Sequence, residues 1–219
     1  PYGFWQRLAF DVTTTSGAGF ICAMQSQGHY AWLDRGRSEV RVDDQTVLVL
    51  PSRAQGLELI AAGTNFLVLS PRGDSWLITE NQGSWILQSL GQHPWSGFPP
   101  SARFASNGQA VLRADEDGVW LGTFGQGAWN RPQRIPVNPC AEEVSCGVSL
   151  AEDGSWLVSG YWGHYLGDGV TFVRLNRPIL GKKEDSVAVA HQGRNGRFIY
   201  LARDDADRGI LEGQPRTTG

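Results

Sequence analysis

The sequence predicts an all-β fold, a β-propeller in which four-stranded sheets, or blades, repeat around an axis. Composition is the first observation, because the 219 residues hold 28 glycines and one methionine and lack the runs of Ala, Leu, Glu and Lys that fill helices. The second is the alternation of short apolar segments with polar turns along the chain. The third is a recurring unit whose period matches that of one blade.

The recurring unit is clearest at residues 69–79 and 150–159. Both copies run from a strand through a polar glycine turn into Ser-Trp-Leu and a second strand, and weaker copies lie at residues 104–112 and 189–200. The glycines of the four turns are separated by 35, 46 and 42 residues. A four-stranded blade takes about 40 to 50 residues, so each copy is expected to mark one blade. These glycines are Gly73, Gly108, Gly154 and Gly196.

Tryptophan side chains are expected to pack between the blades. The two best copies of the unit place Trp76 and Trp156 at the same point, which predicts equivalent, buried positions in two blades. Trp32, Trp85 and Trp120 also alternate inside predicted strands. Within one repeat we expect short β-branched or aromatic strands bounded by Gly, Asn or Asp. These strands are residues 147–150, 156–160, 169–175 and, less clearly, 178–181.

The first 65 residues fit the repeat less well, although five strands are predicted there. Gly19 and Gly56 are candidate turn glycines for the earlier blades. If Gly73 instead closes the outer hairpin of the second blade, five blades result, and otherwise six. We favour five blades in a single domain of residues 1–219, with an incomplete ring or a fragment of a larger protein as an alternative. The five strands are residues 20–24, 29–33, 39–42, 46–50 and 57–61.

Residues 69–78 carry a resemblance to known repeats. Their order, Leu-Ser-Pro-Arg-Gly-Asp-Ser-Trp-Leu-Ile, resembles the hairpin of the TolB-like and WD-repeat propeller families, which reads Ser-Pro-Asp-Gly followed by a short apolar strand. The resemblance extends over residues 66–202. It implies the propeller architecture and no particular activity.

Charge and cysteine content limit the classes of partner, cellular location and metal site that are expected. The 19 basic and 22 acidic residues are mixed along the chain and give a net charge of -3, so neither nucleic acid nor a membrane surface is expected as a partner. We expect a soluble chain, bacterial in style and cytoplasmic, with a periplasmic or secreted location as the alternative. Cys140 and Cys146 are close enough for a local disulfide, but reduced thiols, with Cys22 buried in a strand, are the favoured prediction. No cysteine or histidine spacing indicates a metal site, and no cofactor is expected.

The segment between Gly160 and Gly169 is the main candidate site. Four rings lie between its glycines, and the segment is expected to be a loop joining the second and third strands of a repeat. Such rings either form a contact surface for a partner or ligand, or fold back over the edge of the blade. The candidate binding residues here are Tyr161, Trp162, His164, Tyr165 and Asp168.

Acidic turns make up the second candidate region. Residues 80–83, 115–118 and 204–209 are taken as the equivalent connections of other blades, which predicts one acidic face. Asp115 and Asp117 are its candidate binding residues. Such a face would attract a basic partner or a divalent cation, although Asp and Asn are also the ordinary residues of plain turns.

The favoured function is a non-catalytic interaction, scaffold or sensor module. Its partner is expected to be a protein or another domain of the same polypeptide. The four histidines, at positions 29, 93, 164 and 191, belong to no recognisable catalytic motif, so no catalytic residue is predicted. The alternative is a propeller hydrolase or a carbohydrate-binding lectin that uses the central pocket.

Overall fold

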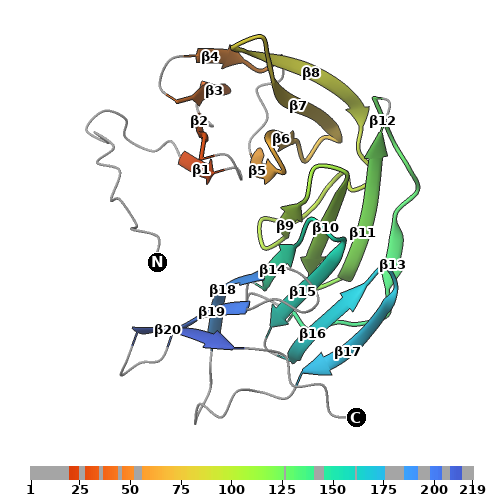
Figure 1. The fold of residues 1–219 in the computed structure, drawn as a ribbon. Coiled ribbons are helices and arrows are strands. Elements are labelled where there is room, and N and C mark those ends of the chain that lie inside the picture. The colour runs from red at the N-terminus through yellow and green to blue at the C-terminus, as the bar shows by residue number, and fades with distance from the viewer. Residues whose placement is uncertain are drawn as a thin grey trace.

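The computed structural model confirms an all-β protein. It describes residues 20–24, 28–34, 37–43, 46–51, 56–125, 127–140, 146–160, 162–175, 185–191, 198–203 and 208–213. Among these residues there are twenty strands and no helix, so the described part of the chain contains no helical segment that could cross a membrane. The strands pair antiparallel except for one parallel contact, and they form sheets that follow one another along an arc (Figure 1).

Five blades can be traced along the arc. The first contains β1 (Phe20–Met24), β2 (Tyr30–Asp34), β3 (Glu39–Val42) and β4 (Thr46–Val49). The second contains β5 (Glu58–Ala62), β6 (Asn65–Leu69), β7 (Asp74–Asn81) and β8 (Ser84–Gln92). The third contains β9 (Arg103–Ser106), β10 (Ala110–Asp115) and β11 (Gly118–Gly125), with β12 (Ala128–Trp129) and β13 (Gln133–Ile135) both paired to β11.

The last two blades complete the arc. The fourth contains β14 (Gly147–Leu150), β15 (Ser155–Gly160), β16 (Gly163–Asp168) and β17 (Thr171–Leu175). In the fifth, the described strands are β18 (Asp185–His191), β19 (Phe198–Arg203) and β20 (Arg208–Gly213). Figure 1 shows β1, β5, β9, β14 and β18 on the inside of the arc, and β4, β8, β13 and β17 on its outside. A parallel bridge between Ala62 of β5 and Ser106 of β9 joins blades 2 and 3 into one nine-stranded sheet. Five repeated blades arranged in this way confirm the predicted propeller architecture.

The strands predicted for the first 65 residues are confirmed, but the turn glycines are partly misassigned. Gly108 and Gly154 close the first hairpins of blades 3 and 4, whereas Gly73 closes the second hairpin of blade 2. The first hairpins of blades 1 and 2 turn at Gly28 and Gly63, both with positive φ, so the choice of Gly56 is wrong. Gly63, Gly73, Gly108 and Gly154 all have positive φ in hairpin turns, so a glycine turn motif does not reveal which hairpin it closes. Gly19, Gly196 and the predicted strand 178–181 lie outside the described residues.

The tryptophan prediction is therefore half right. Trp76 and Trp156 are both buried, with 5% and 0% of their surface exposed. Trp76, however, lies on β7, the third strand of its blade, and Trp156 on β15, the second strand of its blade. The two residues are not equivalent. Trp85 and Trp120 are partly buried against interblade clusters, as predicted, and Trp32 lies beneath the guanidinium of Arg41, 5.0 Å from its ring centroid.

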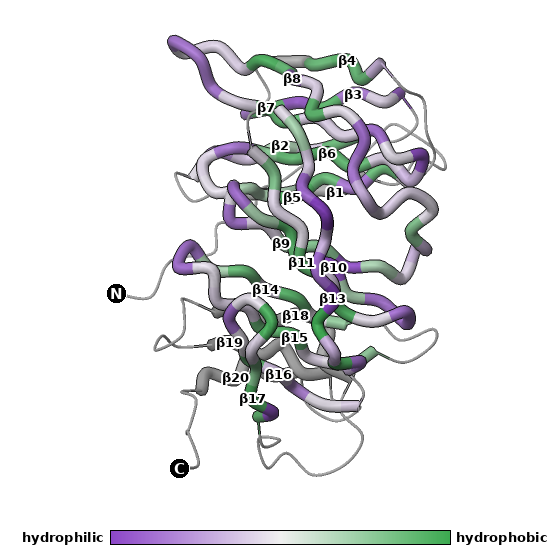
Figure 2. Tube along the Cα trace, turned by 90° about the vertical axis from the view of Figure 1, so that its right-hand side faces the viewer, coloured by the Kyte–Doolittle hydropathy of each residue, from purple (hydrophilic) through white to green (hydrophobic). Residues whose placement is uncertain are grey.

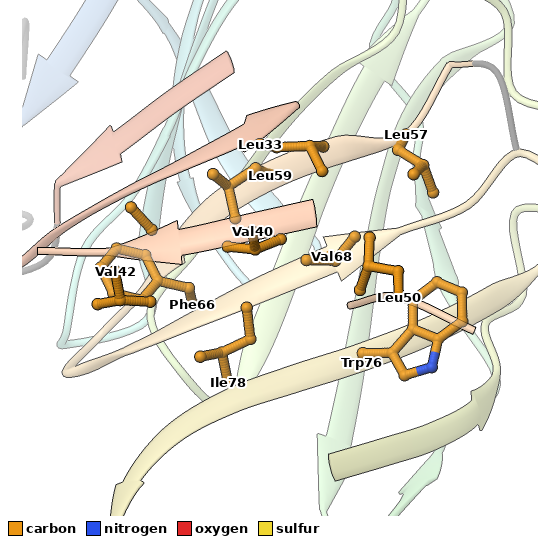
Figure 3. Close-up of a cluster of buried hydrophobic side chains, with 11 residues drawn as sticks. Leu33, Val40, Val42, Leu50, Leu57, Leu59, Phe66, Val68, Trp76 and Ile78 are labelled. Atoms are coloured by element: carbon orange, nitrogen blue, oxygen red, sulfur yellow. The ribbon is translucent and has the colours of Figure 1, made fainter. Parts of the chain in front are cut away.

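Apolar side chains between successive blades form the core. Because side chains alternate between the two faces of a strand, each blade can bury one set of residues against each neighbour. Between blades 1 and 2, Leu33 and Val40 meet Phe66, Val68 and Ile78 (Figure 3). Two further clusters fill the spaces between blades 2 and 3 and between blades 3 and 4.

Candidate functional site

The candidate segment 160–169 is mostly a strand. β15 ends at Gly160 and β16 begins at Gly163, so the turn between them is two residues long. β16 pairs with β15 on one side and with β17 on the other. The predicted loop from residue 161 to residue 168 is wrong. The segment alternates with a period of two, because His164 and Leu166 are buried and Tyr165 between them is half-buried. The high density of aromatic residues made this strand pattern hard to recognise in the sequence.

His164 lies inside the blade. Its side chain is 6% exposed, and its Nδ1 atom is hydrogen-bonded to the Oγ of Ser159, its cross-strand neighbour, which is fully buried. A hydroxyl beside an imidazole is a pairing of nucleophile and base types. Both groups are nearly inaccessible to a substrate, so we assign the pair a structural role between β15 and β16.

Trp162 is the exposed residue of the predicted site, with 58% of its surface accessible. Both backbone polar groups of Trp162 are hydrogen-bonded. The N–H of Trp162 donates to the carbonyl oxygen of Pro139 at 2.9 Å, and its carbonyl oxygen accepts from Nη2 of Arg174 at 2.9 Å. The indole is therefore presented to solvent from a fixed backbone. Tyr161 lies outside the described residues.

Exposed apolar side chains continue from this turn along the outer strand of blade 4. Phe172 contacts Tyr165 edge to face, with 5.9 Å between ring centroids, and the Arg174 guanidinium lies 6.0 Å from the Tyr165 ring. Figure 2 shows the hydrophobic colouring of β17. Of the six exposed large hydrophobic residues among the described residues, four lie here. We call them the blade 4 rim: Trp162 (58% exposed), Val170 (47%), Phe172 (37%) and Val173 (54%).

The equivalent outer strands of blades 2 and 3 are more polar. On β8 the exposed side chains include Ser84, Gln88 and Ser89, with Ile86 as the large apolar exception. On β13 the exposed side chains are Gln133 and Arg134. Exposed apolar patches on soluble proteins commonly mark interaction sites. Sequence reasoning missed Val170, Phe172 and Val173 because it took residues 169–175 for a third strand. The signal was the run Thr-Phe-Val-Arg-Leu, which does not alternate between apolar and polar residues.

A disulfide lies next to the backbone segment that is hydrogen-bonded to Trp162. Cys140 and Cys146 are bonded, with 5.5 Å between their Cα atoms, and both are buried in the cluster between blades 3 and 4. The prediction of reduced thiols is wrong for this pair, while the side chain of Cys22 is not described. Gly160 fits tightly against the bridge, because a Cβ atom there would collide with Cys146 Sγ and the Pro139 carbonyl oxygen.

The two acidic candidates have different surroundings. Asp115 is buried at the end of β10, where its Oδ2 accepts from Nε of Arg113 at 2.6 Å and its Oδ1 accepts from the backbone N–H of Asp117 at 3.0 Å. Burial raises the pKa of Asp115, and the Arg113 charge opposes that rise. The Asp115 carboxylate thus stabilises its own turn and is buried away from any partner. Asp117 is exposed, with its carboxylate 3.8 Å from Nη2 of Arg113.

The predicted shared acidic face is wrong. The turn at residues 115–118 joins second and third strands, whereas that at residues 80–83 joins third and fourth strands. Successive antiparallel hairpins turn at opposite ends of a blade, so these two turns do not share a face. For the same reason the exposed Asp168 lies at the opposite end of blade 4 from Trp162. Residues 204–207 are outside the described chain, and no group of three His, Cys, Asp or Glu with metal-binding geometry occurs within it.

A buried histidine, His93, was not singled out by sequence reasoning. Its Nε2 donates to the carbonyl oxygen of Ser70 at 2.7 Å, and its Nδ1 accepts from the N–H of Trp95 at 3.1 Å. The rings of Trp95, Phe98 and Trp129 surround it at centroid distances of 5.9 to 6.2 Å. Desolvation by this burial lowers the pKa of His93 below its ordinary value of 6.5.

This pKa shift predicts a pH dependence of stability. Between the lowered pKa of folded His93 and pH 6.5, this histidine is protonated in the unfolded chain but stays neutral in the folded one. The contribution of neutral His93 is therefore fully present above pH 6.5 and is lost as the pH falls. We expect denaturant unfolding at pH 7.5 and at lower pH values to show a steeper loss of stability for the parent than for His93→Gln. Parallel pH profiles for the two proteins would contradict this assignment.

Comparisons with known proteins bear on the fold alone. No family model matches the chain, and no curated protein matches it. Among solved structures, the N-terminal domain of Nup159 is similar over 84% of this chain and 61% of that domain, with a TM-score of 0.53 and 12% identity. The chain has the β-propeller fold.

Two further similar structures are a gluconolactonase from Xanthomonas campestris and Prp20p from Saccharomyces cerevisiae. The gluconolactonase matches over 83% of this chain and 68% of its own, with a TM-score of 0.49 and 14% identity. Prp20p matches over 80% of this chain and 54% of its own, with a TM-score of 0.46 and 12% identity. This propeller thus spans about three fifths of the Nup159 domain and about half of Prp20p.

Proposed function

We propose that this propeller is a non-catalytic interaction module. Stacked blades hold the blade 4 rim in a fixed position for a protein partner or for another domain of the same polypeptide. The observation that carries the proposal is the exposure of Trp162, Phe172 and Val173 along one outer edge, whereas the outer strands of blades 2 and 3 expose mostly polar side chains. The resemblance to TolB-like and WD-repeat propellers is part of the same proposal and is supported by the turn at Gly73, whose N–H donates to the Ser70 carbonyl oxygen.

The rim has the features of a preorganised contact surface. Tryptophan is enriched among the residues that dominate binding energy, and a binding loop that is already ordered loses less entropy on association. Both hydrogen bonds of the Trp162 backbone and the Arg174 contact with Tyr165 supply that order here. The buried disulfide next to Gly160 adds to it. Because disulfides persist in oxidising compartments, it favours the periplasmic or secreted location over the cytoplasmic one.

The hydrolase or lectin alternative finds less support. Ser159 and His164 are the described pair whose chemistry would suit a hydrolase, but their burial between strands keeps substrate away from both. The rim, in contrast, is accessible without any rearrangement.

A photo-crosslinking amino acid placed at position 162 tests the proposal. We expect discrete protein adducts in cells of the source organism from position 162, and none from position 86, where Ile86 is also exposed but lies on β8 of blade 2. Trp162→Ala should weaken capture of the identified partner by about 30-fold, equivalent to about 2 kcal/mol. Identical adduct patterns from the two positions would remove the rim from the site.

A further inference from the structure

We propose that the partner of the blade 4 rim is a second copy of this chain, bound by antiparallel pairing of β17 with β17. The inference rests on the proposed function, because it uses the same rim and names what binds there. The two-fold axis of the dimer passes through Val173. Such an interface is isologous, since the same surface of both copies forms it.

An available strand edge is the first observation. Among the described residues β17 has one hydrogen-bonded neighbour, β16, and their ladder is regular from Asp168–Thr171 to His164–Leu175. The N–H and C=O groups on its other side have no strand partner in that part of the chain. An exposed edge of this kind is a template for pairing with a further strand.

The outer strands of blades 2 and 3 carry protective features that β17 lacks. In blade 3 the outer strand β13 has only three residues, and in blade 2 the pairing of β8 with β7 is interrupted by a register shift between Ser75 and Trp76. Bulges, short strands and outward charges are the usual means of blocking edge pairing. β17 has five residues, no proline, no bulge and a single charged residue, Arg174.

Self-complementarity identifies the second copy as the occupant. Facing residues of an antiparallel pair share a face of the sheet, so centring the pair on Val173 places Phe172 opposite Arg174, Val173 opposite Val173 and Thr171 opposite Leu175. Each Arg174, which already lies against the Tyr165 ring, then meets the Phe172 ring of the other copy. All five residues of β17 are paired.

Neighbouring registers are worse. Moving the axis to Arg174 brings the two guanidinium groups directly opposite each other, and like charges in that position repel. Moving it to Phe172 pairs only residues 171–173 and leaves both Arg174 side chains without a ring from the other copy. The register centred on Val173 is therefore favoured, because it avoids facing guanidinium groups and pairs the full length of β17.

A charge-swap experiment tests the pairing. Val173 is 54% exposed, so a long polar side chain is compatible with the folded chain. We expect the parent to sediment as a dimer in a concentration-dependent way, and Val173→Lys and Val173→Glu each to self-associate at least about tenfold more weakly, because like charges would face each other across the axis. An equimolar mixture of the two variants should recover a one-to-one dimer. The control Val49→Lys, at an exposed position on β4, should dimerise as the parent does.

The outcomes separate this inference from the proposed function. A parent that stays monomeric at about 100 µM, a concentration that populates any dimer of moderate affinity, overturns the self-pairing. Variants that dimerise like the parent, or a mixture that stays monomeric, overturn it as well. In each of these cases, adducts from position 162 to a different protein would leave the interaction function standing. If neither a dimer nor any adduct is found, both the self-pairing and the proposed interaction function are wrong.

Discussion

Replacing Trp156 with alanine is expected to lower the free energy of unfolding by about 3 to 5 kcal/mol, the usual cost of truncating a fully buried aromatic side chain. The indole has no exposed surface and lies in the cluster between blades 3 and 4 with Leu112, Val119 and Ile135. Its Nε1 donates to the carbonyl oxygen of Gly169 at 2.9 Å, so the substitution also removes the donor of a partly buried hydrogen bond.

Trp162→Ala is the matched control for this prediction. It removes the same side chain from a position that is 58% exposed on the next strand connection, so its effect on stability should stay within about 0.5 kcal/mol. Urea unfolding followed by circular dichroism measures both variants. Equal losses for the two variants would mean that the Trp162 ring is part of the packed structure and would remove it from the rim.

Adding one methyl group at Gly167 should also be strongly destabilising. Gly167 faces Trp156 across β15 and β16, and the indole lies over the space where a Cβ atom would be. A Cβ there would collide with the Trp156 ring and with the backbone carbonyl oxygen of Thr171. Since the backbone cannot yield as easily as a flexible side chain, we expect Gly167→Ala to cost about 3 kcal/mol, at the upper end of overpacking effects.

Gly125→Ala provides the comparison. Gly125 is exposed on β11, and nothing lies within 4 Å of the position of its Cβ. The substitution should leave the midpoint of thermal unfolding within a few degrees of the parent. A Gly167→Ala variant as stable as Gly125→Ala would show that the indole of Trp156 does not lie over Gly167, and the packing described for blade 4 would need revision.

Much of the fold was accessible from sequence because the signals are local. The strands at 20–24, 39–42 and 46–49 and the burial of Trp76 and Trp156 follow from short β-branched or aromatic apolar runs bounded by turn residues, which are signals that act over a few positions. The errors in placing the turns have one cause. Turns at Gly73 and Gly108 both contain a glycine but close a second and a first hairpin, respectively, and only the pairing of whole strands distinguishes them.

The site was less predictable than the fold. The density of aromatic residues around position 162 led to the proposed contact surface, and of those residues Trp162 is exposed in the structure. His164 was misplaced because a histidine in a strand looks the same in sequence whether it faces solvent or, as here, a buried serine. The exposure of Phe172 and Val173 arises from the position of β17 at the outside of its blade, at which the non-alternating run Thr-Phe-Val-Arg-Leu hints but which only the pairing of strands establishes.

The sequence by itself determined an all-β chain of repeated blades, since the spacing of turns and the alternation of apolar residues are properties of neighbouring positions. Only the tertiary structure decided that Cys140 and Cys146 form a bond against Gly160 and that the Asp115 carboxylate is paired with Arg113. The same holds for β17, which has β16 as its one strand neighbour in the described part of the chain. Each of these depends on which segments meet in space. That is settled by the packing of one blade face against the next, where the contacts join residues far apart in the chain.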